Sequence, residues 1–452
     1  MCSYNRCASG LTCCAPYIVI DNLLYQAAIP GPYAWKWGNG DKRGVTLDTD
    51  GRLQKLESTG VQSLTFGYKP NDLIETITDG INPSLNSSYT WDGSGRLKQV
   101  TRTNGDNQNV GYDNAGNRTS HTRAGTGNTY SYTSTGKDWL THVGSKTYGW
   151  DTYGQMTSDG VRSYTWDAFG RLATAGGATY SYNAFNQRVR KVSSAGTNHF
   201  VYGPSGELLY ESQTGTAYVW LGGAPIAMSR GGQMYAIHTD QVGRPEAVTN
   251  SAKAVVWRAQ NAVWDRQVTT DSIGGLNLGF PGQYYDAETG LWQNWHRYYE
   301  AGTGRYISSD PIGLAGGINT YAYVGGSPLS RTDPNGLAPD DFAPTGPGVA
   351  LRDWFRSILP APRDPTLRSD GLPCGAGCGD ATTDAFVPDF FPKACEAHDA
   401  CYENQQGKNF CDANFRKDMQ QERPDMKVMP WIYYGAVYWL GGGAYSAAGR
   451  KQ

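Results

Sequence analysis

Short runs of alternating apolar and polar residues, separated by turns, fill much of the first half of the chain. In residues 164–172 one such run leads into Asp167-Ala-Phe-Gly170 and then into a second run. A turn of this kind between two alternating runs predicts a β-hairpin. Similar units, each with an aromatic residue followed by Asp or a small polar residue, recur at intervals of 16 to 21 residues. Their aromatic residues are Trp91, Tyr112, Tyr132, Trp150, Trp166, Tyr182 and Tyr202.

Stacking these hairpins would bury a core that a single hairpin could not bury alone. The interval is too short for a β-propeller blade, which needs four strands per unit. A plain β-solenoid and an aromatic surface-binding repeat are the other architectures that fit. The composition agrees with a turn-rich β-protein, because the 452 residues include 58 Gly, 30 Tyr and 14 Trp. No run of about 20 apolar residues occurs, so no membrane-spanning helix is expected.

Net charge and the positions of the cysteines indicate which partners and which cellular compartment to expect. The formal net charge is −2, which gives no electrostatic reason to expect a nucleic-acid partner. The apolar run at residues 17–20 is too short for a classical secretory signal, and no role is assigned to residues 1–37. Four of the 9 cysteines lie in the first 14 residues, and the other five follow Leu372. We therefore expect the C-terminal part to mature in an oxidising compartment.

A block rich in motifs follows the repeats. Its segments are 235–240 (YAIHTD), 280–286 (FPGQYYD), 291–299 (LWQNWHRYY), 304–306 (GRY), 310–314 (DPIGL) and 333–337 (DPNGL). Together with the repeats, these segments resemble Rhs proteins. The resemblance implies an all-β YD-repeat shell over residues 38–234, in which hairpins wind into a spiralling sheet like that of teneurins. It also implies an Rhs core with a self-cleavage plug over residues 235–337.

Two Asp-Pro-x-Gly sequences end this block. Each alone would be an ordinary β-turn, with Pro at its second and Gly at its fourth position. Two carboxylates held in a dry pocket can share a proton, so that one activates water while the other acts as an acid. The resemblance to Rhs self-cleavage implies that Asp310 and Asp333 form such a pair, that Arg305 assists, and that the chain is cut after Leu337.

A Pro-rich linker, residues 338–368, leads to a C-terminal domain over residues 369–452. There the pattern C-x-x-H-D-x-C-Y spans residues 395–402, and a Cys-Asp pair follows at residues 411–412. On a helix, the histidine, aspartate and tyrosine of this pattern would share one face. A glycine-rich loop at residues 373–377 lies just upstream, and its backbone carbonyls suit a hard cation.

These three motifs resemble the catalytic core of secreted calcium-dependent phospholipase A2, a small disulfide-linked all-α domain. The resemblance implies that His398 activates water, Asp412 orients His398 and Tyr402 supports Asp412. Bound Ca²⁺ would polarise the sn-2 ester of a phospholipid, and the activated water would attack it directly.

By the same resemblance, the expected Ca²⁺ ligands are the carbonyls of Pro373, Gly375 and Gly377 together with Asp399. The expected disulfides join Cys374 to Cys395 and Cys401 to Cys411. Pairing of Cys378 with Cys395 fits the spacing as well. The same cysteines and His398 could instead form a structural zinc site.

The sequence thus favours a toxin of the Rhs type that attacks the phospholipid membrane of a rival cell at its interface, without spanning it. Such a protein would be made in a bacterial cytoplasm, delivered by a secretion machine, and matched by an immunity protein in its producer. Two alternatives stay open. One is a surface adhesion or carbohydrate-binding repeat protein with a structural C-terminal domain. The other is a toxin with a non-lipid target.

Overall fold

The computed structural model describes residues 18–25, 32–133 and 136–341. The chain divides into two compact units, Met1–Leu351 and Arg352–Gln452, and all described residues belong to the first. Within the described residues, strands pair in antiparallel fashion and follow one another in sequence order. The sheets are therefore meanders, as the hairpin repeats predict.

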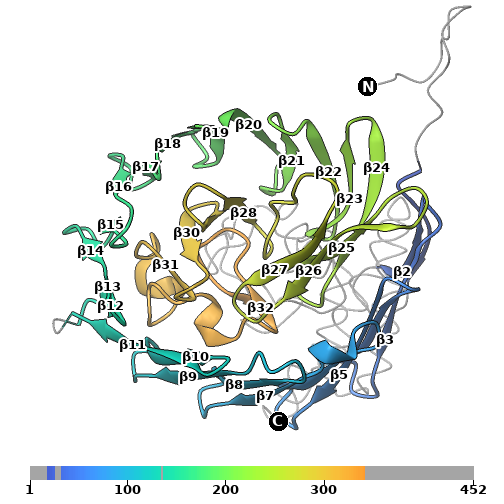
Figure 1. Cartoon of the computed structure of the whole chain (residues 1–452), viewed down its shortest axis with the longest axis horizontal. Helices are drawn as coiled ribbons and strands as arrows, with labels where there is room; N and C mark the ends of the chain where they lie inside the picture. Colours follow the sequence, from blue (N-terminus) through green and yellow to red (C-terminus); the bar gives the residue numbers. More distant parts are fainter. Residues whose placement is uncertain (1–17, 26–31, 134–135, 342–452) are drawn as a thin grey trace, which may run out of the picture. The chain divides into compact units, whose positions relative to one another are not determined.

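Two long meanders form the wall of the first unit, and Figure 1 shows their strands arranged around a smaller set of inner segments. The first meander comprises β1 (Ile20–Tyr25), β2 (Pro32–Trp37), β3 (Lys42–Leu47), β4 (Leu53–Ser58), β5 (Gln62–Tyr68), β6 (Ile74–Asp79), β7 (Ser87–Trp91), β8 (Leu97–Arg102), β9 (Gln108–Tyr112), β10 (Arg118–Arg123), β11 (Thr126–Tyr132), β12 (Leu140–Val143) and β13 (Lys146–Thr147). A short pair, β14 (Gly149–Trp150) and β15 (Met156–Ser158), continues the wall.

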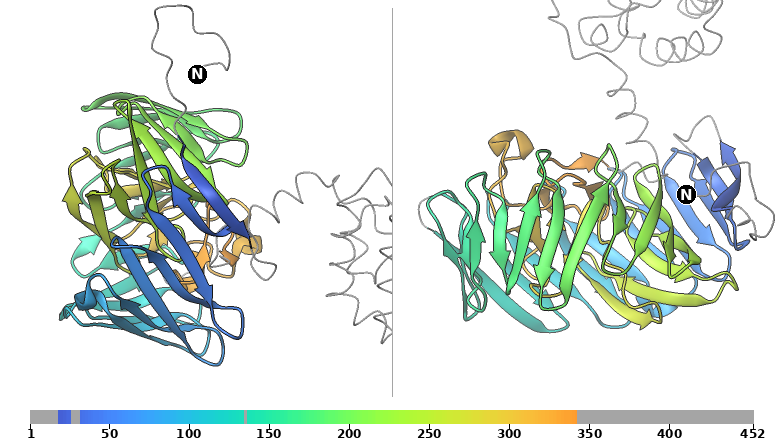
Figure 2. Two further views of the ribbon diagram at one scale, coloured as in Figure 1. Left: turned by 90° about the vertical axis from the view of Figure 1, so that its right-hand side faces the viewer. Right: turned by 90° about the horizontal axis from the view of Figure 1, so that it is seen from above.

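The second meander completes the wall, and Figure 2 shows the wall strands side by side in a curved band. Its strands are β16 (Tyr164–Trp166), β17 (Leu172–Ala175), β18 (Ala178–Tyr182), β19 (Arg188–Ser193), β20 (Gly196–Tyr202), β21 (Leu208–Glu211), β22 (Thr216–Leu221), β23 (Ala224–Arg230), β24 (Gln233–Thr239), β25 (Pro245–Thr249), β26 (Val255–Asn261) and β27 (Arg266–Asp271).

The inner segments follow the wall in sequence. They comprise β28 (Gln283–Asp286), β29 (Leu291–Asn294), β30 (Arg297–Glu300) and β31 (Arg305–Tyr306) in one sheet, and β32 (Arg331–Thr332) paired with β33 (Asp340–Asp341). Three short 3-10 helices complete the described elements: η1 (Pro83–Leu85) on the wall, and η2 (Gly313–Gly316) and η3 (Val324–Gly326) among the inner segments.

A recurring hydrogen-bond pattern explains the aromatic-Asp repeats. In the hairpin of β16 and β17, the indole N–H of Trp166 donates to the carbonyl of Met156 on the preceding strand at 2.8 Å. Oδ1 of Asp167 then accepts from the backbone N–H groups of Phe169 and Arg171 at 2.9 and 3.0 Å. The Arg171 side chain returns to Oδ2 of Asp167 at 2.7 Å. Each aromatic residue thus ties its hairpin to the one before, and the predicted hairpins are confirmed.

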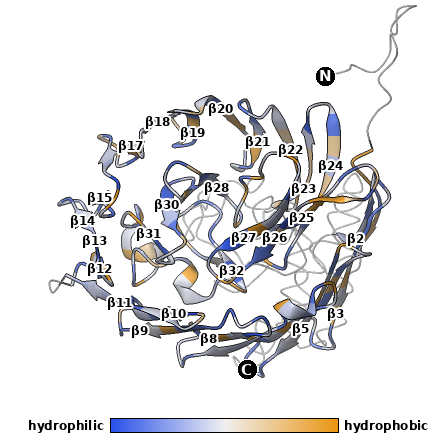
Figure 3. Cartoon of the chain, viewed as in Figure 1, coloured by the Kyte–Doolittle hydropathy of each residue, from blue (hydrophilic) through white to orange (hydrophobic). Residues whose placement is uncertain are grey.

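The core lies where the wall meets the inner segments. Tyr298 and Ile307 of the inner segments share one buried cluster with Tyr164 and Leu172 of the wall. Figure 3 shows apolar residues in strands all round the wall as well as in the inner segments. Apolar burial is the main favourable term in folding, so contacts between the wall and the inner segments stabilise both.

Early and late parts of the wall also meet, through side chains that reach backbone carbonyls. The indole N–H of Trp37 donates to the carbonyl of Ile226 at 2.8 Å, 189 positions away in sequence. Arg258 donates to the carbonyl of Val61 at 2.7 Å, across 197 positions. These contacts join β2 and the β4–β5 turn to strands near the end of the second meander.

Candidate self-cleavage site

Asp310 and Asp333 come together on one arginine. Asp310 follows β31 and Asp333 follows β32, and each carboxylate places an oxygen 3.0 Å from Nη2 of Arg297, the first residue of β30. All three side chains are at most 2% exposed. The structure therefore assembles the pair that the sequence predicted and adds a cation between its members.

Burial dominates the electrostatics of this pair. It raises the pKa of both carboxyls above their ordinary value, and the positive charge of Arg297 opposes the rise. Asp310 has one further donor, the backbone N–H of Ile312, at 3.0 Å from Oδ1. A raised pKa lets a carboxyl hold its proton to higher pH, as acid–base chemistry by such a pair requires.

More donors surround Asp333 than Asp310. The Tyr306 hydroxyl donates to Oδ2 of Asp333 at 2.7 Å, and the backbone N–H of Leu337 donates to Oδ1 at 2.9 Å. The backbone N–H of Ala338 also lowers the pKa of Asp333. Donors stabilise the ionised form of a carboxyl. Of the two, Asp333 is thus better suited to be the carboxylate and Asp310 to carry the proton.

The peptide bond between Leu337 and Ala338 lies between the two carboxyls. Its nitrogen, that of Ala338, lies near Asp333, since its N–H lowers the pKa of that carboxyl. Its carbonyl oxygen and Oδ2 of Asp310 both lie against the Cα of Gly316, where an added methyl group would overlap both atoms. The carbonyl therefore lies on the Asp310 side of the site and the amide nitrogen on the Asp333 side.

The turn that precedes this bond is held from several directions. Nε of Arg297 donates to the carbonyl of Gly336, and Nη1 donates to the carbonyl of Thr320 at 3.1 Å. The carbonyl of Asp333 accepts from Nδ2 of Asn294 at 2.8 Å. Gly336 has a φ of +69° and its Cα lies against the Asn294 backbone, so a side chain has no room there. Backbone and carboxyls are thus positioned by the same group of residues.

Of the four residues predicted for self-cleavage, the structure brings three together and places the fourth elsewhere. Nη2 of Arg305 donates to the carbonyl of Asp138 at 2.6 Å, and its guanidinium lies over the rings of Tyr132 and Tyr321. Arg305 thus fixes the inner segments to the wall, and Arg297 occupies the place expected for it. A charged residue inside the aromatic-rich motif at residues 291–299 was the available signal.

The other predicted site residues lie outside the described residues. They are the proposed lipase residues His398, Asp412 and Tyr402, the proposed Ca²⁺ ligands Pro373, Gly375, Gly377 and Asp399, and the proposed disulfide partners Cys374, Cys395, Cys401 and Cys411. The calcium cofactor and the disulfides stay predictions. In the part of the chain that the structure describes, no group of three or more His, Cys, Asp or Glu side chains could hold a metal ion. The same part contains no helix with the length and apolar character of a membrane span.

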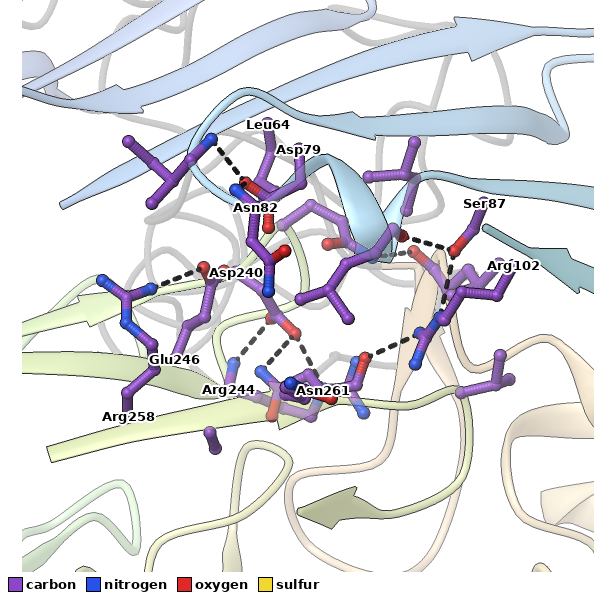
Figure 4. Close-up of a pocket in the computed structure, with 18 of the residues that line it drawn as sticks. Leu64, Asp79, Asn82, Ser87, Arg102, Asp240, Arg244, Glu246, Arg258 and Asn261 are labelled. Atoms are coloured by element: carbon purple, nitrogen blue, oxygen red, sulfur yellow. Dashed lines mark hydrogen bonds and ion pairs between the residues drawn. The ribbon is translucent and has the colours of Figure 1, made fainter. Parts of the chain in front are cut away.

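A second polar site lies where β5–β8 meet the strands from β24 to β27. It is a cavity of about 130 Å³ (Figure 4). Its charged lining residues are Asp79, Arg102, Asp240, Arg244, Glu246 and Arg258. Burial raises the pKa of Glu246 to about 7, against the opposing hydrogen bond from Gln62. Asp240, in contrast, accepts from Arg244 and Asn261 at 2.8 and 2.9 Å. Three acids and three arginines balance, which is typical of a polar junction between two layers.

Two curated toxin proteins are similar in sequence to parts of this chain. The Double-stranded DNA deaminase toxin A of Burkholderia cenocepacia (strain H111) is 36% identical over 157 residues, which are 33% of this chain and 11% of that protein. The Probable deoxyribonuclease RhsA of Dickeya dadantii (strain 3937) is 39% identical over 104 residues, 23% of this chain and 7% of that protein. The chain spans about a tenth or less of these curated relatives.

Solved structures show the same fold. The Photorhabdus luminescens Tc holotoxin pore matches with a TM-score of 0.61 at 16% sequence identity, over 72% of this chain and 19% of that chain. At this identity the likeness concerns the fold alone. It agrees with the wall of meandering strands around inner segments seen in Figures 1 and 2.

The relatives correct the expected enzyme class. Their names state a DNA deaminase toxin and a probable deoxyribonuclease, both of which act on nucleic acid. The prediction of a calcium-dependent phospholipase A2, a carboxylic ester hydrolase, is therefore wrong. These names also disagree with the expectation of no nucleic-acid partner, which rested on net charge alone. The predicted YD-repeat shell, in contrast, is confirmed, since the family model described as Teneurin YD-shell matches residues 36–316. The chain belongs to the teneurin YD-shell family.

Proposed function

We propose that this chain is part of a toxin of the YD-shell type and that its inner core cuts the chain after Leu337. The observation that carries the proposal is the position of one peptide bond. The amide between Leu337 and Ala338 has its nitrogen near Asp333 and its carbonyl oxygen beside Asp310. Both carboxyls have raised pKa values, as a proton-sharing pair requires.

The geometry suggests a role for each carboxyl. Asp333, ionised, takes a proton from water, whose oxygen attacks the carbonyl carbon of Leu337, while Asp310 gives its proton to the carbonyl oxygen. The tetrahedral intermediate then collapses, and the C–N bond breaks. The nitrogen of Ala338 leaves as an amine by taking the proton held on Asp333, and Asp310 regains its proton from the intermediate. Leu337 is left with a new carboxyl group.

Arg297 supports the reaction without exchanging a proton. Its guanidinium pairs with both carboxyls and binds the carbonyl of Gly336, next to the bond that breaks. One rigid, always-charged group thus sets the distance between acid, base and substrate.

Expression of the full chain tests this proposal directly. The wild-type chain of 49.2 kDa should appear on a denaturing gel as two fragments. Mass spectrometry should place the new C-terminus at Leu337. Asp310→Asn and Asp333→Asn should each slow cleavage by roughly 10²–10⁴-fold, because each removes one partner in proton transfer. An unchanged fragment pattern in Asp310→Asn would contradict the proposal.

The released segment, residues 338–452, is by this proposal the toxic part, matched by an immunity protein in the producing cell. The named activities of the relatives favour nucleic acid as its target. Expression of the full chain in bacteria, followed by analysis of plasmid DNA and total RNA, tests the target. Cell death with intact, unmodified nucleic acid would argue against it.

A further inference from the structure

Three consecutive residues connect the wall to the candidate self-cleavage site. Trp295 contacts the wall, His296 contacts the turn that carries the scissile bond, and Arg297 pairs with both carboxyls. We propose that Trp295 is a positioning residue that couples self-cleavage to correct assembly of the wall. This inference rests on the proposed self-cleavage and names the feature that regulates it.

Trp295 docks into the wall at two turns. Its indole N–H donates to the carbonyl of Phe185 at 3.0 Å, in the turn between β18 and β19. Its ring lies directly on the Cα of Gly206, in the turn between β20 and β21, where even a methyl group would overlap the ring. The turns are distant in sequence from Trp295, so this seat exists only once both hairpins are in place.

The backbone of Trp295 is held in an unfavourable conformation. Its φ is +47°, in the left-handed region that residues with a side chain rarely adopt. Trp295 is the first residue of the two-residue loop between β29 and β30, where hairpin turns favour a positive φ. The contacts with Phe185 and Gly206 then hold the indole that this loop presents to the wall.

His296 connects Trp295 to the turn that precedes the scissile bond. Its backbone N–H donates to the carbonyl of Asn335 at 3.3 Å, and its ring Nδ1 lies 2.9 Å from the same oxygen. The imidazole stacks on the indole of Trp295, with ring centroids 5.4 Å apart and planes 10° apart. Asn335 is two residues from Leu337, so a shift of Trp295 would move the scissile bond relative to the carboxyls.

Arg297 completes the connection. It follows His296 directly and contacts Asp310, Asp333 and the carbonyl of Gly336. A rotation of the 295–297 turn would therefore move the scissile bond, which His296 holds, relative to the two carboxylates, which Arg297 holds. Reactions within a folded site lose rate steeply when the reacting groups are misplaced by about 1 Å. The wall thus decides whether the pair is productive.

A time course of cleavage during cell-free translation tests the inference. The full chain is pulse-labelled, translation is stopped, and the conversion of precursor to fragments is followed on denaturing gels. Trp295→Ala should lower the rate constant by roughly 100-fold while the reaction still runs to completion. Trp295→Phe, which keeps a ring but loses the N–H, should recover part of the rate.

Gly206→Ala approaches the same contact from the wall. The new methyl group should push the indole away and slow cleavage, although residue 206 touches neither carboxyl. Gly51→Ala is the matched control. Gly51 also ends a wall turn with a positive φ, +81° against +89° for Gly206, but nothing lies within 4 Å of the added methyl group. Gly51→Ala should cleave at the wild-type rate.

The outcomes separate the inference from the proposal on which it rests. A purely structural role for Trp295 would lower the fraction of chains that ever cleave and leave the rate constant unchanged, which would overturn the inference. Wild-type rates in both Trp295→Ala and Gly206→Ala would also overturn it, with self-cleavage itself intact. Cleavage that persists in Asp310→Asn would instead refute the proposed reaction. If Trp295→Ala does not fold, the cleavage rate constants of Trp295→Phe and Gly206→Ala test the inference instead. Both should be lower than that of the wild type.

Discussion

The wall and the inner core use the same turn, Asp-x-x-Gly, with opposite electrostatic results. In the wall, the N–H of Gly170 donates to the carbonyl of Asp167 at 3.0 Å, and in the core the N–H of Gly313 donates to the carbonyl of Asp310 at the same distance. Both aspartates also accept from the N–H two residues on. The local backbone therefore does not distinguish a structural aspartate from a candidate catalytic one.

The difference lies in the partner of the second carboxylate oxygen and in burial. Burial tends to raise the pKa of Asp167, but the backbone N–H and the guanidinium of Arg171 lower it below the ordinary value. The core turns have a leucine at the position of Arg171, Leu314 and Leu337, and burial prevails there. In the core, burial outweighs the one arginine that pairs with both aspartates, Arg297, and raises their pKa values.

The two regions consequently respond to pH in opposite directions. Asp167 has a folded-state pKa below its unfolded value, so its stabilising contribution is lost as pH falls through the folded pKa. Asp310 and Asp333 have folded-state pKa values above the unfolded ones. Their contribution to stability therefore declines as pH rises from the unfolded to the folded pKa. Ionisation of these two carboxyls therefore lowers the stability of the core.

The largest expected effect comes from breaking the shared cation. Arg297→Met removes the positive charge that opposes the pKa rise, so both pKa values should rise further and a larger fraction of Asp333 should be protonated at a given pH. Cleavage near pH 7 should fall by roughly 100-fold or more, and the acid limb of the rate profile should move to higher pH. Pulse-labelled chains followed at several pH values give the profile. Arg297→Lys keeps a charge without the planar fork and should be intermediate; an unshifted acid limb in Arg297→Met would show that Arg297 does not set these pKa values.

A smaller effect is expected from Tyr306→Phe. The hydroxyl donates to Oδ2 of Asp333 at 2.7 Å, so its loss should raise the pKa of Asp333 and slow cleavage about tenfold near neutral pH, which corresponds to one hydrogen bond of about 1.4 kcal/mol. Tyr299→Phe is the matched control, because the Tyr299 hydroxyl is equally buried but donates to the carbonyl of Trp264 at 3.0 Å. Equal rates in the two variants would show that the Tyr306 hydroxyl does not act on the pair.

The smallest effect is expected in the wall. Arg171→Met removes a partly exposed ion pair with Asp167, which should lower the free energy of unfolding by about 1 kcal/mol or less. The loss of stability on acidification should also become shallower, because the pKa of Asp167 returns towards its ordinary value. Thermal unfolding at neutral and acidic pH measures both effects. Self-cleavage should keep its wild-type rate, and a slowed reaction would mean that this turn communicates with the core.

Much of the wall and part of the site could be predicted from sequence. Alternation and Gly turns identify the hairpins, and the aromatic-Asp pairs mark their ends, because these signals are local. Asp310, Asp333 and Leu337 were found through their motifs. Arg297 was missed because Arg297 and Arg305 both lie in short core strands, and which of them meets the carboxyls depends on tertiary placement.

Long-range features gave no local signal. Nothing around Trp37 or Arg258 indicates that β2 and β26 reach carbonyls nearly 200 positions away, since such contacts follow from the curvature of the whole wall. The positive φ of Trp295 fits the two-residue loop between β29 and β30, but the contact of its indole with the distant Phe185 turn has no local signal. The C-terminal enzyme class was predicted wrongly, because a short cysteine-histidine pattern was given the meaning that it has in another family.

The order of strand pairing has a consequence for timing. Because each strand of the two meanders pairs with its neighbour in sequence, the wall can be built strand by strand as the ribosome delivers the chain. Asp333 and the bond it faces emerge after every strand from β1 to β32. The turn that carries Asp333 is therefore synthesised after the strands of the wall, so the proposed cleavage would follow their assembly.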